Sequence, residues 1–292
     1  MSDKPPRLGC LRIEFRAARD MTFRRDPTYL LLAALYRALD ESGEVAADLM
    51  WRLHNGQPKP FALSPLILER AGGDVPAASV SNVAAGDRLR VRWSALDAAT
   101  LAALPRVLVP YLVEGRTIAL ERGDIRVEGW SLLRPPGTAI PVAPTYADLF
   151  AHARPADEIA LRFTSPVAFR RGAEPIPLDQ LAARHFFGGY LERWRAFSPA
   201  EMGDRPAAEL LDAIQLQQPL ELWPAPPPRW PSKAPRQAAI GVARFHVEGD
   251  AGLRRRVTAL ANYAWYCGTG GATAFGYGQT ERIPPDPVAG SQ

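Results

Sequence analysis

Apolar and polar residues alternate along parts of the chain, and elsewhere apolar residues recur at helical spacing. Residues 8–17 alternate, which predicts a half-buried strand. Asp26 and Pro27 are typical of a helix N-cap and first turn, and we expect that helix to run to about residue 39. The rest of the first half predicts a short apolar segment, three stretches of strand and one helix interrupted at Pro105, at residues 45–53, 59–68, 87–94, 117–133 and 97–113.

A proline-rich stretch, residues 134–144, separates this half from a second one with a similar order. The second half predicts strands and two long helices, at residues 158–171, 178–197, 219–223, 238–247, 250–266 and 272–283. Two successive halves with a βαββαβ rhythm predict an α+β protein made of two tandem ferredoxin-like (RRM-like) domains. We expect these domains to span residues 1–140 and 145–292.

Composition fits a globular protein with a basic surface. Of the 292 residues, 47% are hydrophobic and 23% charged, which is enough apolar material for a core. The net charge is +4, and only three of the 35 basic residues are lysines. Arginine forks suit phosphates and stack on bases, so an RNA or DNA partner is indicated. A GC-rich genome would also enrich Arg, Ala, Gly and Pro, so composition alone leaves both explanations open.

The two cysteines, Cys10 and Cys267, lie far apart and form no CxxC pair. This spacing argues against a zinc site and a disulfide framework, and we expect neither a metal nor a cofactor. The chain has no basic-then-apolar leader and no apolar run of membrane-spanning length. The sequence therefore predicts a soluble, cytoplasmic protein without a membrane partner.

Residues 268–278 contain five glycines: Gly268, Gly270, Gly271, Gly276 and Gly278. They follow a predicted helix and precede a predicted strand, the reverse of a nucleotide-binding fingerprint. No Walker lysine is present either, which disfavours an enzyme with a nucleotide phosphate loop. Without a Cβ, these residues would let backbone N–H groups approach a polyanion closely. The other interpretation is a tight helix-to-strand turn, although capping alone explains five glycines poorly.

The run ANYAWYCGTGGATAFGYGQTE (residues 261–281) resembles the C-terminal signature of the RAMP superfamily, the CRISPR-associated RNA-binding proteins built from ferredoxin-like domains. FTSPVAFRRG (163–172) and LHNGQPKPFALSPL (53–66) resemble two further segments of one family in it, the repeat-processing endoribonuclease that is sixth in the CRISPR-associated numbering. The resemblance implies CRISPR repeat RNA (pre-crRNA) as the partner, with CRISPR effector subunits as further candidates. It also implies a monomer or homodimer.

RNA can be cleaved by attack of its own 2′-OH on the adjacent phosphate, with proton transfers that histidine can supply. His54 precedes an Asn-Gly turn, so His54 and Lys59 are expected to flank a loop and face one cleft. The resemblance implies that His54 is the general base or acid, Lys59 its electrostatic partner and Tyr36 the third member. It further implies metal-independent cleavage to 2′,3′-cyclic phosphate and 5′-hydroxyl ends. On the residues alone, a histidine beside such a turn is usually solvated, and Tyr36 on an apolar helix is usually core.

Arginines supply the remaining candidates for RNA contact: Arg170, Arg171, Arg244, Arg254, Arg255 and Arg256. The last three open the helix before the glycines, where cations oppose the helix dipole, so an external anion is indicated. The alternative function is a catalytically inert RAMP subunit that binds RNA in a CRISPR effector complex. A pure binder would not need Tyr36, His54 and Lys59 together.

Overall fold

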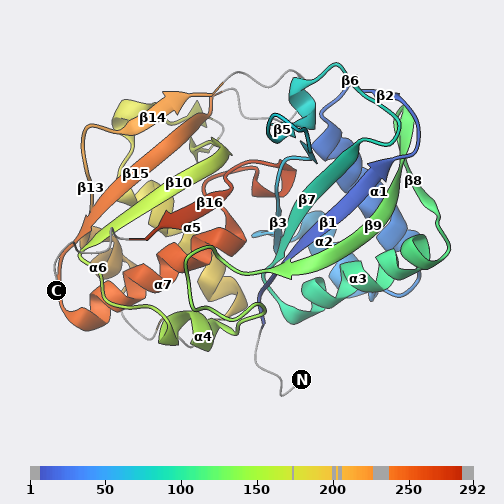
Figure 1. Cartoon of the computed structure of the whole chain (residues 1–292). Coiled ribbons are helices and arrows are strands. Elements are labelled where there is room, and N and C mark those ends of the chain that lie inside the picture. Colours follow the sequence, from blue (N-terminus) through green and yellow to red (C-terminus); the bar gives the residue numbers. More distant parts are fainter. Residues whose placement is uncertain (1–6, 173, 199–201, 203–205, 226–236, 285–292) are drawn as a thin grey trace, which may run out of the picture.

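Two antiparallel sheets stand side by side in the computed structural model, each backed by helices (Figure 1). The structure describes residues 7–172, 174–198, 202, 206–225 and 237–284. Within that part of the chain, no helix combines the length and apolar character needed to cross a membrane. The helices are α1 (Pro27–Glu41), α2 (Ala47–Asn55), α3 (Ala98–Val113), α4 (Tyr146–Ala151), α5 (Ala183–Phe197), α6 (Ala207–Asp212) and α7 (Ala251–Cys267), with 3₁₀ turns η1 (Ala77–Ser79), η2 (Leu178–Gln180) and η4 (Thr273–Phe275).

The first sheet is centred on β1, whose alternating apolar residues are buried as the sequence predicts. Leu11, Ile13 and Phe15 are each at most 2% exposed. The strand order is β5-β4-β7-β1-β9-β8, and β3 also pairs with β7. The strands are β1 (Gly9–Ala17), β3 (Phe61–Leu63), β4 (Ile67–Leu68), β5 (Val75–Pro76), β7 (Arg88–Ala95), β8 (Thr117–Leu120) and β9 (Gly123–Leu133), and β2 (Met21–Thr22) pairs separately with β6 (Asn82–Val83).

The second sheet is centred on β10 and β15. Its order is β13-β15-β10-β16, with β14 also paired to β15. Helix α7 is buried from Val257 to Cys267, because it packs beside α5 on this sheet and also contacts α4 and the strands β3 and β7 of the first sheet. The strands are β10 (Glu158–Val167), β13 (Ile214–Leu216), β14 (Glu221–Pro224), β15 (Ala239–Val247) and β16 (Thr280–Ile283), and β11 (Arg170–Arg171) pairs separately with β12 (Glu174–Pro175).

Side-chain caps fix where the two long helices of the first half begin. The Asp26 carboxylate accepts a 2.8 Å hydrogen bond from the Thr28 N–H, and Pro27 occupies the first turn, as predicted. The Asp97 carboxylate accepts from the Thr100 N–H at 2.7 Å in the same way. Local residue type therefore determines both helix starts.

Several predicted elements were wrong in detail. The predicted strand 117–133 is two strands, β8 and β9, and the predicted helix 178–197 is the turn η2 followed by α5. Helix α3 continues through Pro105, because the proline removes only one N–H donor and the freed carbonyl lies on a half-exposed turn. The predicted strand 59–68 is divided into β3 and β4 at Pro65, which cannot donate to the sheet. The predicted strand 272–283 is a strand only from Thr280, since positive φ angles upstream are incompatible with extended backbone.

The two halves share residues between their cores. One apolar cluster is built from residues 11–127 together with Ala274, and the other from residues 140–267 together with Leu8, Cys10 and Leu96. The glycine-rich segment thus inserts Ala274 into the core of the first half, beside β3. The division into domains 1–140 and 145–292 stays a prediction.

Candidate functional site

The last turn of α2 brings the three candidate catalytic side chains together. The hydroxyl of Tyr36, on α1, donates a 2.8 Å hydrogen bond to the backbone carbonyl of Leu53. The ammonium of Lys59 donates to the carbonyls of Leu53 and His54, at 2.8 and 2.5 Å. These carbonyls carry the negative end of the helix dipole, which attracts a cation. The chain reverses after the helix C-cap at Gly56, and this reversal returns Lys59 to the helix end.

These side chains line a cavity of about 380 Å³ between α1 and the end of α2. The exposed imidazole of His54 packs on the ring of Tyr36, with 4.2 Å between ring centroids. Lys59 and Phe275 complete this part of the wall. An accessible imidazole can accept or donate a proton, and an ammonium beside it can face an anion. We call this cavity the histidine pocket.

Burial shifts the pKa values of Tyr36 and Lys59 in opposite directions. It raises the pKa of Tyr36, and it lowers the pKa of Lys59, because burial disfavours the charged form of each. The Tyr36 phenol therefore stays protonated at neutral pH, and its proton is committed to the Leu53 carbonyl. This geometry suits a residue that holds the turn carrying His54 better than one that exchanges a proton with RNA.

The glycine-rich segment, residues 268–278, is a compact loop closed on the protein's own backbone. The N–H groups of Gly271 and Gly278 donate 2.8 Å hydrogen bonds to carbonyls of residues 166–168. A Cβ on Gly270 would lie 2.3 Å from a carbonyl oxygen of the same segment, and one on Gly278 would lie 2.0 Å from that of Thr269. Positive φ angles occur at Gly268, Gly270, Ala272, Gly276 and Gly278.

The close approach that these glycines permit is therefore an approach to the chain itself. For Gly271 and Gly278 this corrects the expectation that their N–H groups are available to a polyanion, since both already have carbonyl partners. Gly270 and Gly271 are half-exposed and line a cavity, whereas Gly276 and Gly278 are buried. RNA contact by the loop stays a prediction, and its partly exposed residues within 270–275 are Gly270, Gly271, Ala272 and Phe275.

Helix α5 holds this loop in place. The guanidinium of Arg193 donates to the carbonyls of Cys267, Gly268 and Gly270 at 3.1, 3.0 and 2.9 Å. One turn earlier on the same face, the Tyr190 hydroxyl is hydrogen-bonded to that of Thr269. Arg193 thus supplies a positive charge at the C-terminal end of α7, where the helix dipole favours it.

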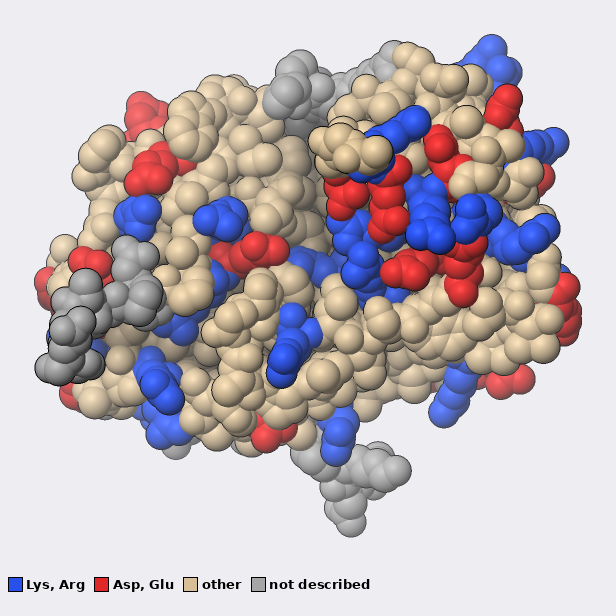
Figure 2. Space-filling view, viewed as in Figure 1, with Lys and Arg blue, Asp and Glu red and all other residues tan. Residues whose placement is uncertain are grey.

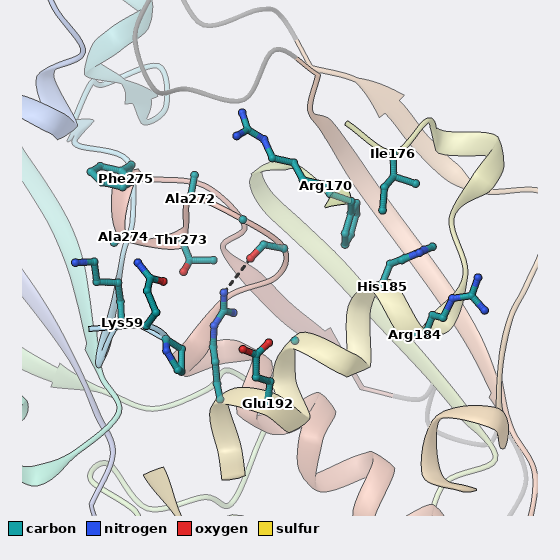
Figure 3. Close-up of a pocket in the computed structure, with 17 residues that line it drawn as sticks. Lys59, Arg170, Ile176, Arg184, His185, Glu192, Ala272, Thr273, Ala274 and Phe275 are labelled. Atoms are coloured by element: carbon teal, nitrogen blue, oxygen red, sulfur yellow. Dashed lines mark hydrogen bonds between the residues drawn. The ribbon is translucent and has the colours of Figure 1, made fainter. Parts of the chain in front are cut away.

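A second cavity, of about 520 Å³, lies between the glycine-rich loop, the start of α5 and residues 57–59 (Figure 3). Lys59 and Phe275 line both this cavity and the histidine pocket, so the two adjoin. In the close-up, Ile176 and His185 face Lys59 and Phe275 across the opening. Sequence reasoning did not single out the five lining residues of α5, because only the fold brings them to the loop: Arg184, His185, Gly189, Glu192 and Arg193.

The imidazole of His185 has a defined hydrogen-bonding state. Its Nδ1 accepts a 2.9 Å hydrogen bond from the Ala182 N–H and so caps α5. Burial, together with the charges of Arg184 and Arg171, lowers the pKa of His185. The ring is therefore neutral at neutral pH, with its proton on Nε2 as a hydrogen-bond donor.

The predicted RNA-binding arginines differ in their surroundings. Arg170 and Arg171 form the short strand β11, both exposed, and Arg170 lines the second cavity. Arg244 is paired with Glu221 at 3.0 Å. Of these three, Arg170 is the one placed beside the candidate catalytic residues.

The arginine run at the start of α7 has partners inside the protein. Arg255 donates to the carbonyls of Phe150 and Ala151 at 3.1 and 3.2 Å, at the C-terminal end of α4, and Arg256 donates to that of Met202 at 3.4 Å. Carbonyls at the C-terminal end of α4 thus accept hydrogen bonds from Arg255, so Arg255 has a partner without an external anion. With a rise of about 1.5 Å per residue, the run lies about 20 Å along α7 from the loop. RNA binding by Arg254, Arg255 and Arg256 stays a prediction without support from these contacts.

Figure 2 shows interleaved basic and acidic side chains over the exposed face of the first sheet. Arg90 is paired with Glu69 at 3.5 Å and with Asp74, and Arg16 is paired with Glu128. Carboxylates therefore offset much of the positive charge on this face. Among the described residues, no carboxylate lies within ion-pair distance of Arg170 or Arg184 at the second cavity, so an anion would be better attracted there.

The remaining histidines show no comparable setting. The Nδ1 atom of His152 lies 2.8 Å from the Asp148 carbonyl at the end of α4, and His246 is half-buried in β15. Among the residues with described positions, no three His, Cys, Asp or Glu side chains are grouped closely enough to hold a metal ion.

Comparison with known proteins confirms the fold and the resemblance drawn from the sequence. Residues 161–280 match the family described as CRISPR-associated endoribonuclease Cas6. A Cas6 product complex superposes with a TM-score of 0.67 at 24% identity over 95% of this chain and 100% of that one. A Cas6 from Thermus thermophilus gives 0.66 at 20% identity over 96% and 100% of the two chains, and the product of a Cas6-related gene from Pyrococcus furiosus gives 0.59 at 12% over 94% and 98%. No curated protein matches.

Proposed function

We propose that this chain, a Cas6-type protein with the tandem ferredoxin-like RAMP fold, is an endoribonuclease that cuts CRISPR repeat RNA into guide units. The catalytic part of this proposal rests on one observation: two adjoining cavities share lining residues. His54 and Lys59 line one, Lys59 and the accessible glycine-rich stretch line the other, and Phe275 belongs to both. A strand of RNA that follows the loop therefore passes the imidazole.

The chemistry that these residues support is attack of a ribose 2′-OH on the adjacent phosphorus. A base removes the 2′-OH proton, the new O2′–P bond forms, the P–O5′ bond breaks, and an acid protonates O5′ as it leaves. The products are a 2′,3′-cyclic phosphate and a 5′-hydroxyl, and no external nucleophile is consumed. In this proposal the reaction needs no metal, because side chains move the proton and offset the charge.

Each candidate has a role that fits its surroundings. His54, accessible at the end of α2, transfers the proton as general base or acid. Lys59, whose ammonium lies against two carbonyls of that turn, offsets the charge that builds on the phosphorane oxygens. Tyr36 orients the turn and packs on the imidazole.

Analysis of the product ends tests this function. Repeat RNA from the host is incubated with the protein and the cut is mapped. We expect 5′ ends that polynucleotide kinase labels without prior dephosphorylation, and 3′ ends that ligate only after the cyclic phosphate is opened and removed. His54→Ala should lower the rate about 100-fold or more. The matched control is His152→Ala, an exposed histidine remote from both cavities, which should cut normally.

Two results would count against the proposal. Products with 5′-phosphate ends would require a water nucleophile and a different mechanism. Tight binding of the repeat without cleavage would favour the alternative, an inert RNA-binding subunit of a CRISPR effector complex.

A further inference from the structure

The second cavity has the size of a small-ligand site and a mixed lining. Its volume of about 520 Å³ lies within the range of roughly 300–1,000 Å³ typical of such sites. Phe169 and Ile176, both less than 9% exposed, supply an apolar floor. Arg170 and Arg184 stand at the rim, and Lys59 stands where the cavity meets the histidine pocket.

This combination fits one chemical class. An apolar floor that includes an aromatic ring suits the face of a nucleobase, and a rim of arginines suits the phosphates on either side of it. His185 adds a hydrogen-bond donor through Nε2, because its Nδ1 is occupied by the Ala182 N–H. Glu192 adds an acceptor in the same wall, able to receive an N–H from a base edge.

The cavity also adjoins the proposed catalytic residues. Lys59 lines both cavities, so a phosphate held by its ammonium has the histidine pocket on one side and the second cavity on the other. We propose that the second cavity, hereafter the nucleotide pocket, holds the base of one unpaired nucleotide directly beside the cleaved phosphate. This inference rests on the proposed function, and it names a position of the substrate that the catalytic residues do not determine.

Two neighbouring glycines on α5 allow a matched test. Gly189 lines the nucleotide pocket, and a Cβ placed on it would meet no atom within 4 Å, so Gly189→Leu should occupy part of the pocket without a clash at Cβ. Gly188 does not line the pocket, and a Cβ there would be in ordinary contact with Leu211 at 4.0 Å. Both substitutions raise helix propensity, so neither should unfold the protein. Thermal melting of the two variants checks this directly.

The experiment combines these variants with abasic RNA. The cut is mapped, and the nucleotide on its 5′ side or its 3′ side is replaced by an abasic residue. In the Gly188→Leu control, an abasic residue at one of the two positions should lower kcat/KM about 5- to 150-fold relative to intact RNA, and at the other position it should have little effect. This range is the one expected for loss of base stacking. For Gly189→Leu, the intact RNA should already show a comparable loss, and the same abasic residue should add less than about twofold.

Other outcomes would overturn the assignment. The nucleotide pocket is rejected if Gly189→Leu cuts intact RNA as fast as the control does. It is also rejected if the abasic penalty persists undiminished in Gly189→Leu, or falls equally on both flanking positions. If neither protein cuts RNA, the proposed function fails. The pocket is then tested by dissociation constants for repeat RNAs that each carry one abasic residue. A single position at which the abasic residue weakens binding, and does so no longer in Gly189→Leu, supports the pocket. Equal dissociation constants along the whole repeat would overturn it.

Discussion

The ring of Tyr36 packs on the ring of His54 at 4.2 Å, and the Tyr36 hydroxyl is bonded to the carbonyl of Leu53, the residue before His54. One tyrosine on α1 thus fixes both the turn that carries the imidazole and one face of the imidazole itself. The contact joins residues 18 positions apart, and it makes Tyr36 a positioning residue in the proposed site.

Tyr36→Phe should separate positioning from catalysis. The substitution keeps the ring and removes one hydrogen bond, so we expect the free energy of unfolding to fall by about 1 kcal/mol. Cleavage should slow by less than about tenfold, against about 100-fold or more for His54→Ala. Urea unfolding and single-turnover cleavage measure the two effects. A Tyr36→Phe enzyme of normal stability that is as inactive as His54→Ala would show that the hydroxyl acts on the RNA.

Lys59 should set the alkaline limit of the reaction. The ammonium is the active form, and burial lowers the pKa of Lys59, so its charge is lost at a lower pH than that of an exposed lysine. We expect the cleavage rate to fall as the pH rises through this pKa. Lys59→Arg keeps its charge throughout and should move the fall to higher pH. Single-turnover rates from about pH 7 to about pH 10 test this, and a fall at the same pH in both proteins would contradict it.

The glycine-rich loop should tolerate a methyl group at one glycine and not at its neighbour. Gly270 has φ +72° and a carbonyl oxygen 2.3 Å from the site of its missing Cβ, whereas Gly271 has 3.7 Å of clearance to the same oxygen. We expect Gly270→Ala to cost about 2 kcal/mol or more in the free energy of unfolding and Gly271→Ala less than about 0.5 kcal/mol. Equal costs in urea unfolding would refute the packing role of Gly270.

Arg193 should stabilise the protein more than an exposed arginine does, because it holds the glycine-rich loop. Arg193→Met leaves the carbonyls of Cys267, Gly268 and Gly270 without this donor. We expect a loss of about 2 kcal/mol of stability. Binding of repeat RNA should also weaken, since residues of the loop line the second cavity and Phe275 lines both cavities. Arg106→Met, at an exposed position of α3, is the control and should change neither. If Arg193→Met melts at the same temperature as the unmodified protein, the hydrogen bonds of Arg193 do not stabilise the loop and the prediction is wrong.

Local signals in the sequence predicted much of the fold. Asp26 and Asp97 cap their helices through their own side chains, and the alternation in β1 matches the buried face of the sheet. Pro105 misled the prediction, because a proline in an exposed helical turn removes one hydrogen bond without ending the helix.

The candidate site was predictable only in part. His54 and Lys59 belong to a segment that the family resemblance singled out, and Tyr36 is the third member that it implies; the structure brings the three together. Arg184 and His185 lie more than 120 residues from Lys59 in sequence, so only packing of α5 against the loop makes them neighbours of it. The partners of Arg255 could not be predicted either, since they are carbonyls at the end of α4, about a hundred residues away in sequence.

The most direct test of the account is cleavage of the host's repeat RNA in EDTA, with unmodified RNA beside RNA carrying a single 2′-deoxy at the cut. The account predicts that the unmodified RNA is cut at the same rate with and without EDTA, and that the deoxy RNA is bound but not cut. Cleavage that stops in EDTA, or that survives loss of the 2′-OH, would contradict it.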